Sequence, residues 1–200
     1  MRGWAMGLVV CVLGAGPASP DEEEGFVSLF DPERLAEWSQ CGPGGFKVEG
    51  GVATGSGGMG LWTYRKKTYA NFTLRGEFRQ EEKSDSGIFV RFPDPGNDPW
   101  IAVKQGHEVE IGDATKPSFK STGSIYAFHG PTELPLNPTG SWNAYEITCS
   151  GKRYQVSLNG KPVTDYLDAA GRPLRGYVGI QNYPYPGAVH HRKVRIKELP

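Results

Sequence analysis

The stretch WNAYEITCSGKRYQVSLNG, residues 142–160, decides the fold class. Its side chains alternate in period two over residues 142–149 and again over residues 153–158, which is typical of half-buried β-strands. Ser150-Gly151 separates the two runs, and Asn159-Gly160 is a strong signal for a tight hairpin turn. The stretch therefore predicts consecutive antiparallel strands joined by short turns.

The same period-two pattern recurs along most of the chain. Further strands are expected at Phe46–Glu49, Val52–Thr54, residues 71–79, Ser86–Phe92, His107–Ile111, Gly123–Phe128, Tyr177–Gln181 and Val189–Ile196. The one helical signal covers residues 31–38, where Asp31 can cap and Pro32 suits the first helical position. Long returns over residues 93–105 and 130–141 favour Greek-key crossings. About ten strands with one short N-terminal helix predict a single all-β domain, a sandwich or a barrel.

The composition fits an all-β domain and limits the kinds of partner that the protein is expected to bind. The 200 residues include 28 glycines and 16 prolines, without the period of collagen or a low-complexity run. Lys and Arg together number 22, as do Asp and Glu, so the formal net charge is zero. A neutral chain lacks the basic field that holds nucleic acid or an anionic membrane surface. A neutral ligand is expected, and no feature implies a protein partner.

The first residues have the pattern of a secretory signal peptide. Arg2 precedes an apolar run over residues 5–13, and small residues follow up to Ala18. The run is too short to span a bilayer, which takes about 20 residues. We expect residues 1–18 to be a removed leader, residues 19–24 to be an acidic mature N-terminus, and residues 25–200 to form the domain of an exported protein. A lipoprotein signal at Cys11 fits less well, because Val10 is large for the position before the cysteine.

Two cysteines remain once the leader is removed. Cys41 and Cys149 could form a disulfide in an exported domain. Alternatively both are thiols, with Cys149 in the core because it shares the parity of Tyr145 and Ile147. The sequence leaves the two alternatives open.

Several phrases, taken together in this order, identify a family. The phrases are GFVSLFD (residues 25–31), LWT (61–63), YANFTLRGEF (69–78), SGIFVR (86–91), GHEVEI (106–111), TGSIY (122–126), WNAYEI (142–147), LNG (158–160), GYVGIQ (176–181) and RKVRI (192–196). They resemble the 3-keto-disaccharide hydrolase family over roughly residues 25–199. The resemblance implies a concanavalin A-like jelly-roll sandwich of two antiparallel sheets, and a carbohydrate substrate oxidised at carbon 3. The same sandwich also serves lectins, so the fold alone does not establish catalysis.

Two acids are the leading site candidates. Val109 and Ile111 take the core side of their strand, which places Glu108 and Glu110 on the opposite face, about 7 Å apart along the chain. Paired carboxyl groups can hold a sugar, bind a divalent metal ion or act as acid and base. A solvated outer face is the alternative. No cofactor is certain, and a divalent ion at Glu108 and Glu110 stays a hypothesis.

Other candidates come from the neighbouring phrases. Arg91 follows the parity of Phe89 rather than that of Ile88 and Val90, so it is expected to face the cleft with the acids, either at the substrate or as their ion-pair partner. The remaining candidates are polar or aromatic residues near strand ends. They are His129 as a catalytic base, and Tyr126, Gln181, Trp62 and Trp142 as substrate-binding residues. Trp100 is a further possible stacking platform.

The chemistry implied by the resemblance is an elimination. A ketone at carbon 3 acidifies the proton on carbon 2, and the aglycone oxygen on carbon 1 can then leave. The sequence hypothesis assigns His129 or Glu110 as the base, and Arg91 or a divalent ion as the group that holds the enediolate oxygen. One alternative is a non-catalytic carbohydrate-binding module. Another is a retaining β-glucanase, from the acids at Glu108, Glu110 and Asp113.

Overall fold

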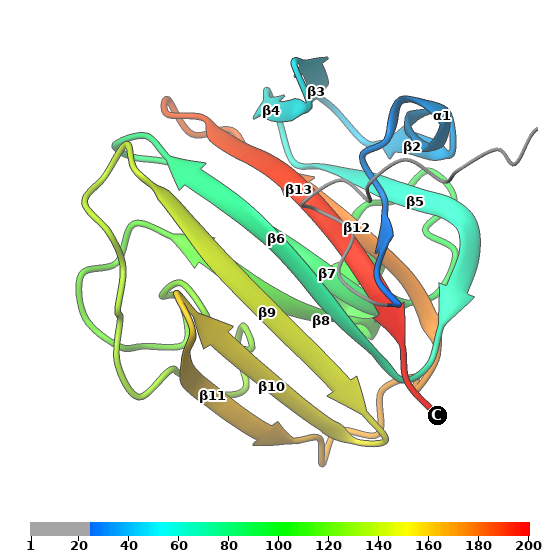
Figure 1. Ribbon diagram of the computed structural model, residues 1–200, viewed down its shortest axis with the longest axis vertical. Helices are drawn as coiled ribbons and strands as arrows, with labels where there is room; N and C mark the ends of the chain where they lie inside the picture. Colours follow the sequence, from blue (N-terminus) through cyan, green and yellow to red (C-terminus); the bar gives the residue numbers. More distant parts are fainter. Residues whose placement is uncertain (1–24) are drawn as a thin grey trace, which may run out of the picture.

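A computed structural model describes residues 25–200 and confirms the all-β sandwich of two antiparallel sheets (Figure 1). The large sheet has eight strands, ordered β11-β10-β9-β6-β13-β4-β3 with β1 paired to β13. The small sheet has five strands, ordered β2-β5-β12-β7-β8. In Figure 1 the large sheet faces the viewer, and β7 and β8 of the small sheet lie behind it.

The elements have the following bounds. The large sheet consists of β1 (Val27–Ser28), β3 (Gly45–Glu49), β4 (Val52–Ser56), β6 (Phe72–Gln80), β9 (Trp142–Ser150), β10 (Arg153–Leu158), β11 (Lys161–Leu167) and β13 (Val189–Glu198). The small sheet consists of β2 (Trp38–Cys41), β5 (Gly60–Tyr69), β7 (Asp85–Phe92), β8 (His107–Gly112) and β12 (Gly176–Asn182). The helices are α1 (Pro32–Leu35) and α2 (Trp100–Gln105).

The core lies between the two sheets and follows the predicted parity. Ile147 of β9 pairs with Leu74 of β6 and with Val156 of β10, and all three side chains are buried. The small sheet contributes Val90 and Val109 to the same cluster. Burial of these alternating apolar side chains fixes the register, because a shift by one residue would turn each of them to the other face.

Two helical details differ from the expectation. The helix predicted within residues 31–38 ends earlier, because Trp38 enters β2 and is buried in the core. Asp31 makes no side-chain cap, and its carboxylate instead accepts a hydrogen bond from Arg34 at 2.7 Å. The sequence also missed α2, which lies in the expected long return.

The strand predicted at Gly123–Phe128 is wrong. This segment makes isolated bridges through Ile125 and otherwise turns, with Ala127 in the left-handed region at φ 63°. A left-handed residue interrupts an extended strand. The segment therefore forms a folded loop beside β8 instead of another full strand.

The predicted leader (residues 1–18) and acidic segment (residues 19–24) lie outside the described residues. Within residues 25–200, no helix is long and apolar enough to cross a membrane.

Cys41 and Cys149 are both free, buried thiols, so the disulfide alternative is not realised. Cys149 is a core residue, as its parity indicated.

Candidate active site

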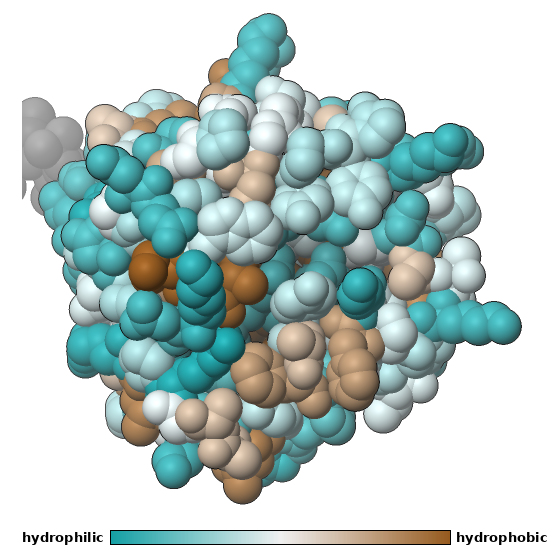
Figure 2. Space-filling model, turned by 180° about the vertical axis from the view of Figure 1, so that it is seen from behind, coloured by the Kyte–Doolittle hydropathy of each residue, from teal (hydrophilic) through white to brown (hydrophobic). Residues whose placement is uncertain are grey.

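The candidate site is a hollow on the face of the small sheet that points away from the core. Glu108 and Glu110 of β8 both line it, as their parity predicted. The hollow has a volume of about 180 Å³. Figure 2 shows this side of the molecule, which is hollowed near its centre with hydrophilic and hydrophobic residues around it. Period two on one strand thus brings two carboxyl groups into one pocket.

Gly87 on β7 makes room for one of these carboxyl groups. A Cβ atom at this position would lie 2.1 Å from Glu108 Oε1, which is far inside van der Waals contact. The Glu108 side chain therefore lies across the backbone of β7. Any larger residue at position 87 would displace the carboxyl group.

Side chains from neighbouring elements complete the lining of the pocket. Gln181 comes from β12 and Tyr126 from the folded loop beside β8, so both predicted residues join the two glutamates. Trp100 of α2, a possible stacking platform from the sequence, also lines the hollow. The lining residues that the sequence had not put forward are Asp85, Val103, Lys120, Tyr183 and Tyr185. Asp85 is the most consequential of them, because it adds a third carboxyl group. It reaches the pocket because it pairs with Gly112 at the far end of β8.

The three carboxyl groups differ in ionisation. Burial, followed by the charge of Asp85, raises the pKa of Glu108 to about 8. Burial also raises the pKa of Glu110 well above 4.5, with Glu108 and then Asp85 adding to the effect. Burial and the nearby Asp113 raise the pKa of Asp85 to about 6. At pH 7 Asp85 is therefore mainly ionised and Glu108 mainly protonated, and Glu110 keeps its proton to a higher pH than an exposed glutamate does.

Two oxygen atoms in this pocket lack partners. Glu110 Oε1 and Gln181 Oε1 are buried and accept no hydrogen bond from any residue in the range 25–200. Glu110 is 5% exposed and Glu108 is 7% exposed. A buried polar atom without a partner costs free energy, so such atoms indicate a ligand or a function. A ligand that carries hydroxyl groups would supply the missing donors.

Arg91 is the main correction to the predicted site. It sits at a β-bulge, because its φ is 56° and the pairing of β7 with β12 shifts between Val90 and Phe92. A bulge inserts one extra residue and reverses the alternation of side chains. The Arg91 side chain therefore points between the sheets, away from the hollow that holds Glu108 and Glu110.

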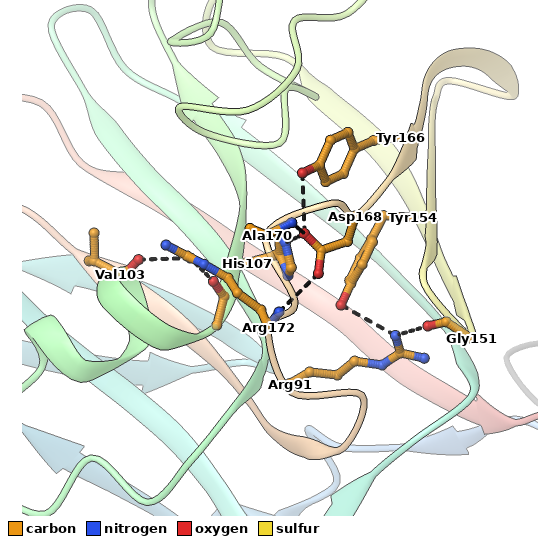
Figure 3. A network of polar contacts seen from close by, with 10 residues as sticks. Arg91, Val103, His107, Gly151, Tyr154, Tyr166, Asp168, Ala170 and Arg172 are labelled. Carbon is orange, nitrogen blue, oxygen red and sulfur yellow. Dashed lines mark hydrogen bonds and ion pairs between the residues drawn. The ribbon is translucent and has the colours of Figure 1, made fainter.

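The buried guanidinium of Arg91 joins two loops and a strand, and Figure 3 shows its contacts with Gly151 and Tyr154. Nε donates to Ala70 O at 2.7 Å, and Nη1 donates to Gly151 O at 2.6 Å and to Tyr154 Oη at 3.3 Å. The residue is 0% exposed. Arg91 thus has a structural role, and the predicted role as a cleft electrophile is wrong.

Replacing Arg91 tests this structural role. Arg91→Met should lower the free energy of unfolding by about 2–4 kcal/mol, because the partly buried hydrogen bonds to Ala70 O and Gly151 O and the bond to the buried Tyr154 hydroxyl are lost. Urea denaturation measures the loss. The control is Arg153→Met, which removes an exposed pair with Asp165 and should change stability little. A value for Arg91→Met that matches the control would contradict the structural role.

The two histidines of this region lie outside the hollow. His107 is buried in the core, with Nε2 3.5 Å from Asp168 Oδ1 and its ring centroid 4.2 Å from that of Tyr154. Burial lowers the pKa of His107 to about 4, so the ring is neutral at pH 7. His129 lies against Tyr166 of β11, with ring centroids 6.0 Å apart, and does not line the hollow. The structure does not bring His129, the predicted base, together with Glu110.

The two tryptophans predicted to bind substrate also lie elsewhere. Trp62 is buried in the core, where its ring stacks on Trp38 at 4.4 Å and on Phe46 at 5.1 Å between centroids. Trp142 is the first residue of β9, and the guanidinium carbon of Arg192 lies 3.9 Å from the centroid of the Trp142 ring. Its parity is opposite to the core positions of β9, so it lies on the outer face of the large sheet. Neither residue reaches the hollow.

The hypothesis of a divalent metal ion does not fit these residues. Within residues 25–200, no group of three or more His, Cys, Asp or Glu side chains is arranged to hold a metal. Magnesium and calcium need about six oxygen ligands, and those ligands must be deprotonated. The three carboxyl groups of the pocket, those of Asp85, Glu108 and Glu110, do not provide such a set, and the proposed reaction uses no metal.

Helix α2, which forms one wall of the hollow, is held in place from the loop after β11 (Figure 3). Arg172 Nη1 donates to Val103 O at 3.0 Å and also to Gly106 O, at the C-terminal end of α2. The same loop is fixed by Asp168, whose Oδ2 accepts a hydrogen bond from Arg172 N at 3.0 Å. These contacts fix the position of the helix that carries Trp100.

Comparisons with solved structures agree with the fold. Two Parabacteroides distasonis proteins, each called a "putative glycosyl hydrolase", share 22% and 20% identity, with TM-scores of 0.72 and 0.76. The first match covers 87% of this chain and 99% of that one, and the second covers 92% and 98%. The carbohydrate binding module CBM66 from Bacillus subtilis shares 14% identity over 81% of this chain and 96% of its own, with a TM-score of 0.62.

The sequence itself decides the family. No curated protein matches the chain. The family model of the 3-keto-alpha-glucoside-1,2-lyase-like domain, that is the 3-keto-disaccharide hydrolase family, matches residues 25–197. This span includes every phrase that carried the resemblance and every helix and strand except the last residue of β13. The chain therefore belongs to the 3-keto-alpha-glucoside-1,2-lyase-like family.

Proposed function

We propose that the protein cleaves the glycosidic bond of 3-keto-glycosides by elimination followed by hydration. The observation that carries the proposal is one pocket with three carboxyl groups in two ionisation states. Asp85 is available as a base at neutral pH, and Glu108 and Glu110 are available as acids. An enzyme needs such a pair of groups with separated pKa values for acid and base catalysis.

The reaction follows from the ketone at carbon 3. A base removes the proton from carbon 2, and the ketone stabilises the resulting carbanion as an enediolate. The electron pair then forms the double bond between carbons 1 and 2 while the bond from carbon 1 to the aglycone oxygen breaks. That oxygen takes a proton and leaves as an alcohol. Addition of water, with hydroxyl to carbon 1 and a proton to carbon 2, then gives the free 3-keto-sugar.

Each step has a candidate residue in the pocket. The Asp85 carboxylate takes the proton from carbon 2, and the Glu110 carboxyl gives a proton to the leaving oxygen. Glu108, kept protonated by burial, donates a hydrogen bond to the enediolate oxygen, as a neutral carboxylic acid can in an apolar site. In the hydration step Glu110 takes a proton from water and Asp85 returns its proton to carbon 2. Both carboxyl groups are then restored.

The family and the neighbours support a carbohydrate-related function. The family description names a lyase acting on 3-keto-glucosides, and two neighbours of this fold are named as glycosyl hydrolases. The CBM66 neighbour supports a second candidate, a non-catalytic module that binds carbohydrate through the same hollow. The unpartnered oxygens of Glu110 and Gln181 suit a sugar hydroxyl in either case.

A direct assay separates these candidates. The purified protein is mixed with a 3-keto-glucoside and with its parent glucoside, and release of the aglycone is followed. We expect turnover of the keto form alone. Saturable binding without turnover would support the binding module instead. Hydrolysis of an unoxidised β-glucan would support a retaining glucanase, and the elimination proposal would then be wrong.

Export remains a proposal from the sequence. The pattern of residues 1–18 predicts a cleaved leader, and Ala18 is the last small residue of the expected cleavage region. N-terminal sequencing of the protein from the extracellular or periplasmic fraction would test it. A mature chain that still starts at Met1 would contradict export by this leader.

A further inference from the structure

Two exposed aromatic side chains stand on the rim of the hollow. Trp100 is 43% exposed and Tyr185 is 46% exposed, although both are large and partly apolar. They come from different segments, since Trp100 begins α2 and Tyr185 lies in the loop between β12 and β13. Residues 25–200 contain six such exposed large hydrophobic side chains, and two of them line this one hollow. Exposed apolar surface gathered at one place indicates a binding surface.

The size of the hollow limits what it can enclose. Its volume of about 180 Å³ lies below the range of about 300–1,000 Å³ for pockets that bury a drug-sized ligand. The carboxyl groups of Glu108 and Glu110 are nearly fully buried within it. A single sugar ring over these groups therefore fills the hollow, and the group attached to carbon 1 extends to the rim.

Contacts hold the segments that carry the two rim side chains. The ring of Tyr185 packs against that of Tyr183, with centroids 5.7 Å apart. Trp100 N donates to Asp98 Oδ1 at 3.0 Å, and Arg172 holds the other end of α2. A preorganised platform loses little conformational entropy on binding. The flat faces of Trp and Tyr suit a ligand that has a flat apolar face of its own.

We propose that Trp100 and Tyr185 bind the leaving group of the substrate, and that this leaving group is a ring with a flat apolar face. An aryl ring and a second pyranose ring share this chemistry. The inference rests on the proposed function, because it assumes that the oxidised sugar occupies the hollow. It adds that substrates with ring-shaped aglycones are preferred over simple alkyl glycosides.

Steady-state kinetics on three substrates tests the proposal. The substrates are the 3-keto derivatives of phenyl glucoside, a glucose disaccharide and methyl glucoside. Trp100→Ala and Tyr185→Ala should each raise KM about 2- to 10-fold for substrates with a ring-shaped leaving group. The loss for the methyl substrate should be small by comparison. Trp100→Phe should recover most of the lost affinity, because it restores an aromatic face.

The control is Leu167→Ala, since Leu167 is exposed but lies on β11, outside the hollow. Its kinetics should match those of the wild type. A larger loss with the phenyl substrate than with the disaccharide identifies an aryl leaving group, and the reverse identifies a sugar. Equal losses on all three substrates, or no loss with either rim variant, would overturn the proposal.

A binding measurement separates this inference from the reaction. The affinities of unoxidised phenyl glucoside and methyl glucoside are measured calorimetrically for the wild type and both rim variants. If the wild type turns over no keto-glycoside but still binds phenyl glucoside more tightly, and the rim variants lose this preference, the proposed reaction fails and the rim site stands. If turnover occurs without such a preference, the rim site fails alone.

Discussion

Glu110→Gln is expected to lower kcat for a 3-keto-glycoside by about 10²- to 10⁴-fold, the usual contribution of a general acid or base. Glutamine keeps the size and polarity of the side chain but cannot deliver a proton to the leaving oxygen. The Glu110 carboxyl is nearly buried, so water cannot easily replace it as the proton donor. Single-turnover and steady-state assays of aglycone release measure the effect.

The same substitution should stabilise the protein at alkaline pH. A carboxyl group whose folded-state pKa is raised binds its proton more tightly in the folded protein than in the unfolded chain. Its stabilising effect is present below the ordinary value of 4.5 and is lost as pH rises through the folded pKa. Urea denaturation should therefore show a gap in the free energy of unfolding between Glu110→Gln and the wild type that widens in favour of the variant as pH rises above 4.5.

Glu82→Gln is the matched control, because Glu82 is exposed and outside the pocket that holds Glu110. It should leave both turnover and the pH dependence of stability unchanged. Full activity of Glu110→Gln would remove Glu110 from the mechanism. A variant that lost activity together with stability at every pH would instead point to a structural defect.

Local alternation was enough to predict the sandwich and its two central acids. The strand at His107–Ile111 is predicted from period two alone, and the same parity places Glu108 and Glu110 on one face. Asp85 had a usable signal that was missed. Asp85 shares the parity of Gly87 and Phe89 on β7, which pair with Glu110 and Glu108 of β8. Its side chain therefore lies on the same face of the small sheet as the two glutamates.

Features that depend on tertiary context could not be predicted in this way. The bulge at Arg91 has no composition signal, because left-handed backbone at an arginine is set by surrounding contacts. Trp62 lies in a strand segment buried on both faces, since α2 and neighbouring side chains cover Leu61 on the outer side. A strand segment that is buried on both faces has no period-two pattern. The sequence therefore did not indicate that Trp62 is a core residue, and it was predicted to bind substrate. Trp142 was different, because its parity relative to Tyr145 already indicated the outer face.

Asp85→Asn should lower kcat/KM by about 10²- to 10⁴-fold and change the shape of its pH profile. In the wild type, activity should rise with pH through about 6, as Asp85 becomes the carboxylate that acts as the base. It should fall as pH rises through about 8, when Glu108 loses the proton that it donates to the enediolate oxygen. The variant has no base to ionise near pH 6, so its residual activity should keep only the fall, which should move to lower pH because the charge of Asp85 no longer raises the pKa of Glu108.

Asp113→Asn provides a graded control for this assignment. The charge of Asp113 helps to raise the pKa of Asp85, so its removal should move the rise in activity to lower pH without removing it. Asp113 does not line the hollow, and the activity plateau of this variant should stay near that of the wild type. If Asp85→Asn kept the rise near pH 6, the base would be another group. If Asp113→Asn left the rise where it was, the titration would not belong to Asp85, because no other carboxyl group of the pocket has Asp113 among the charges that raise its pKa.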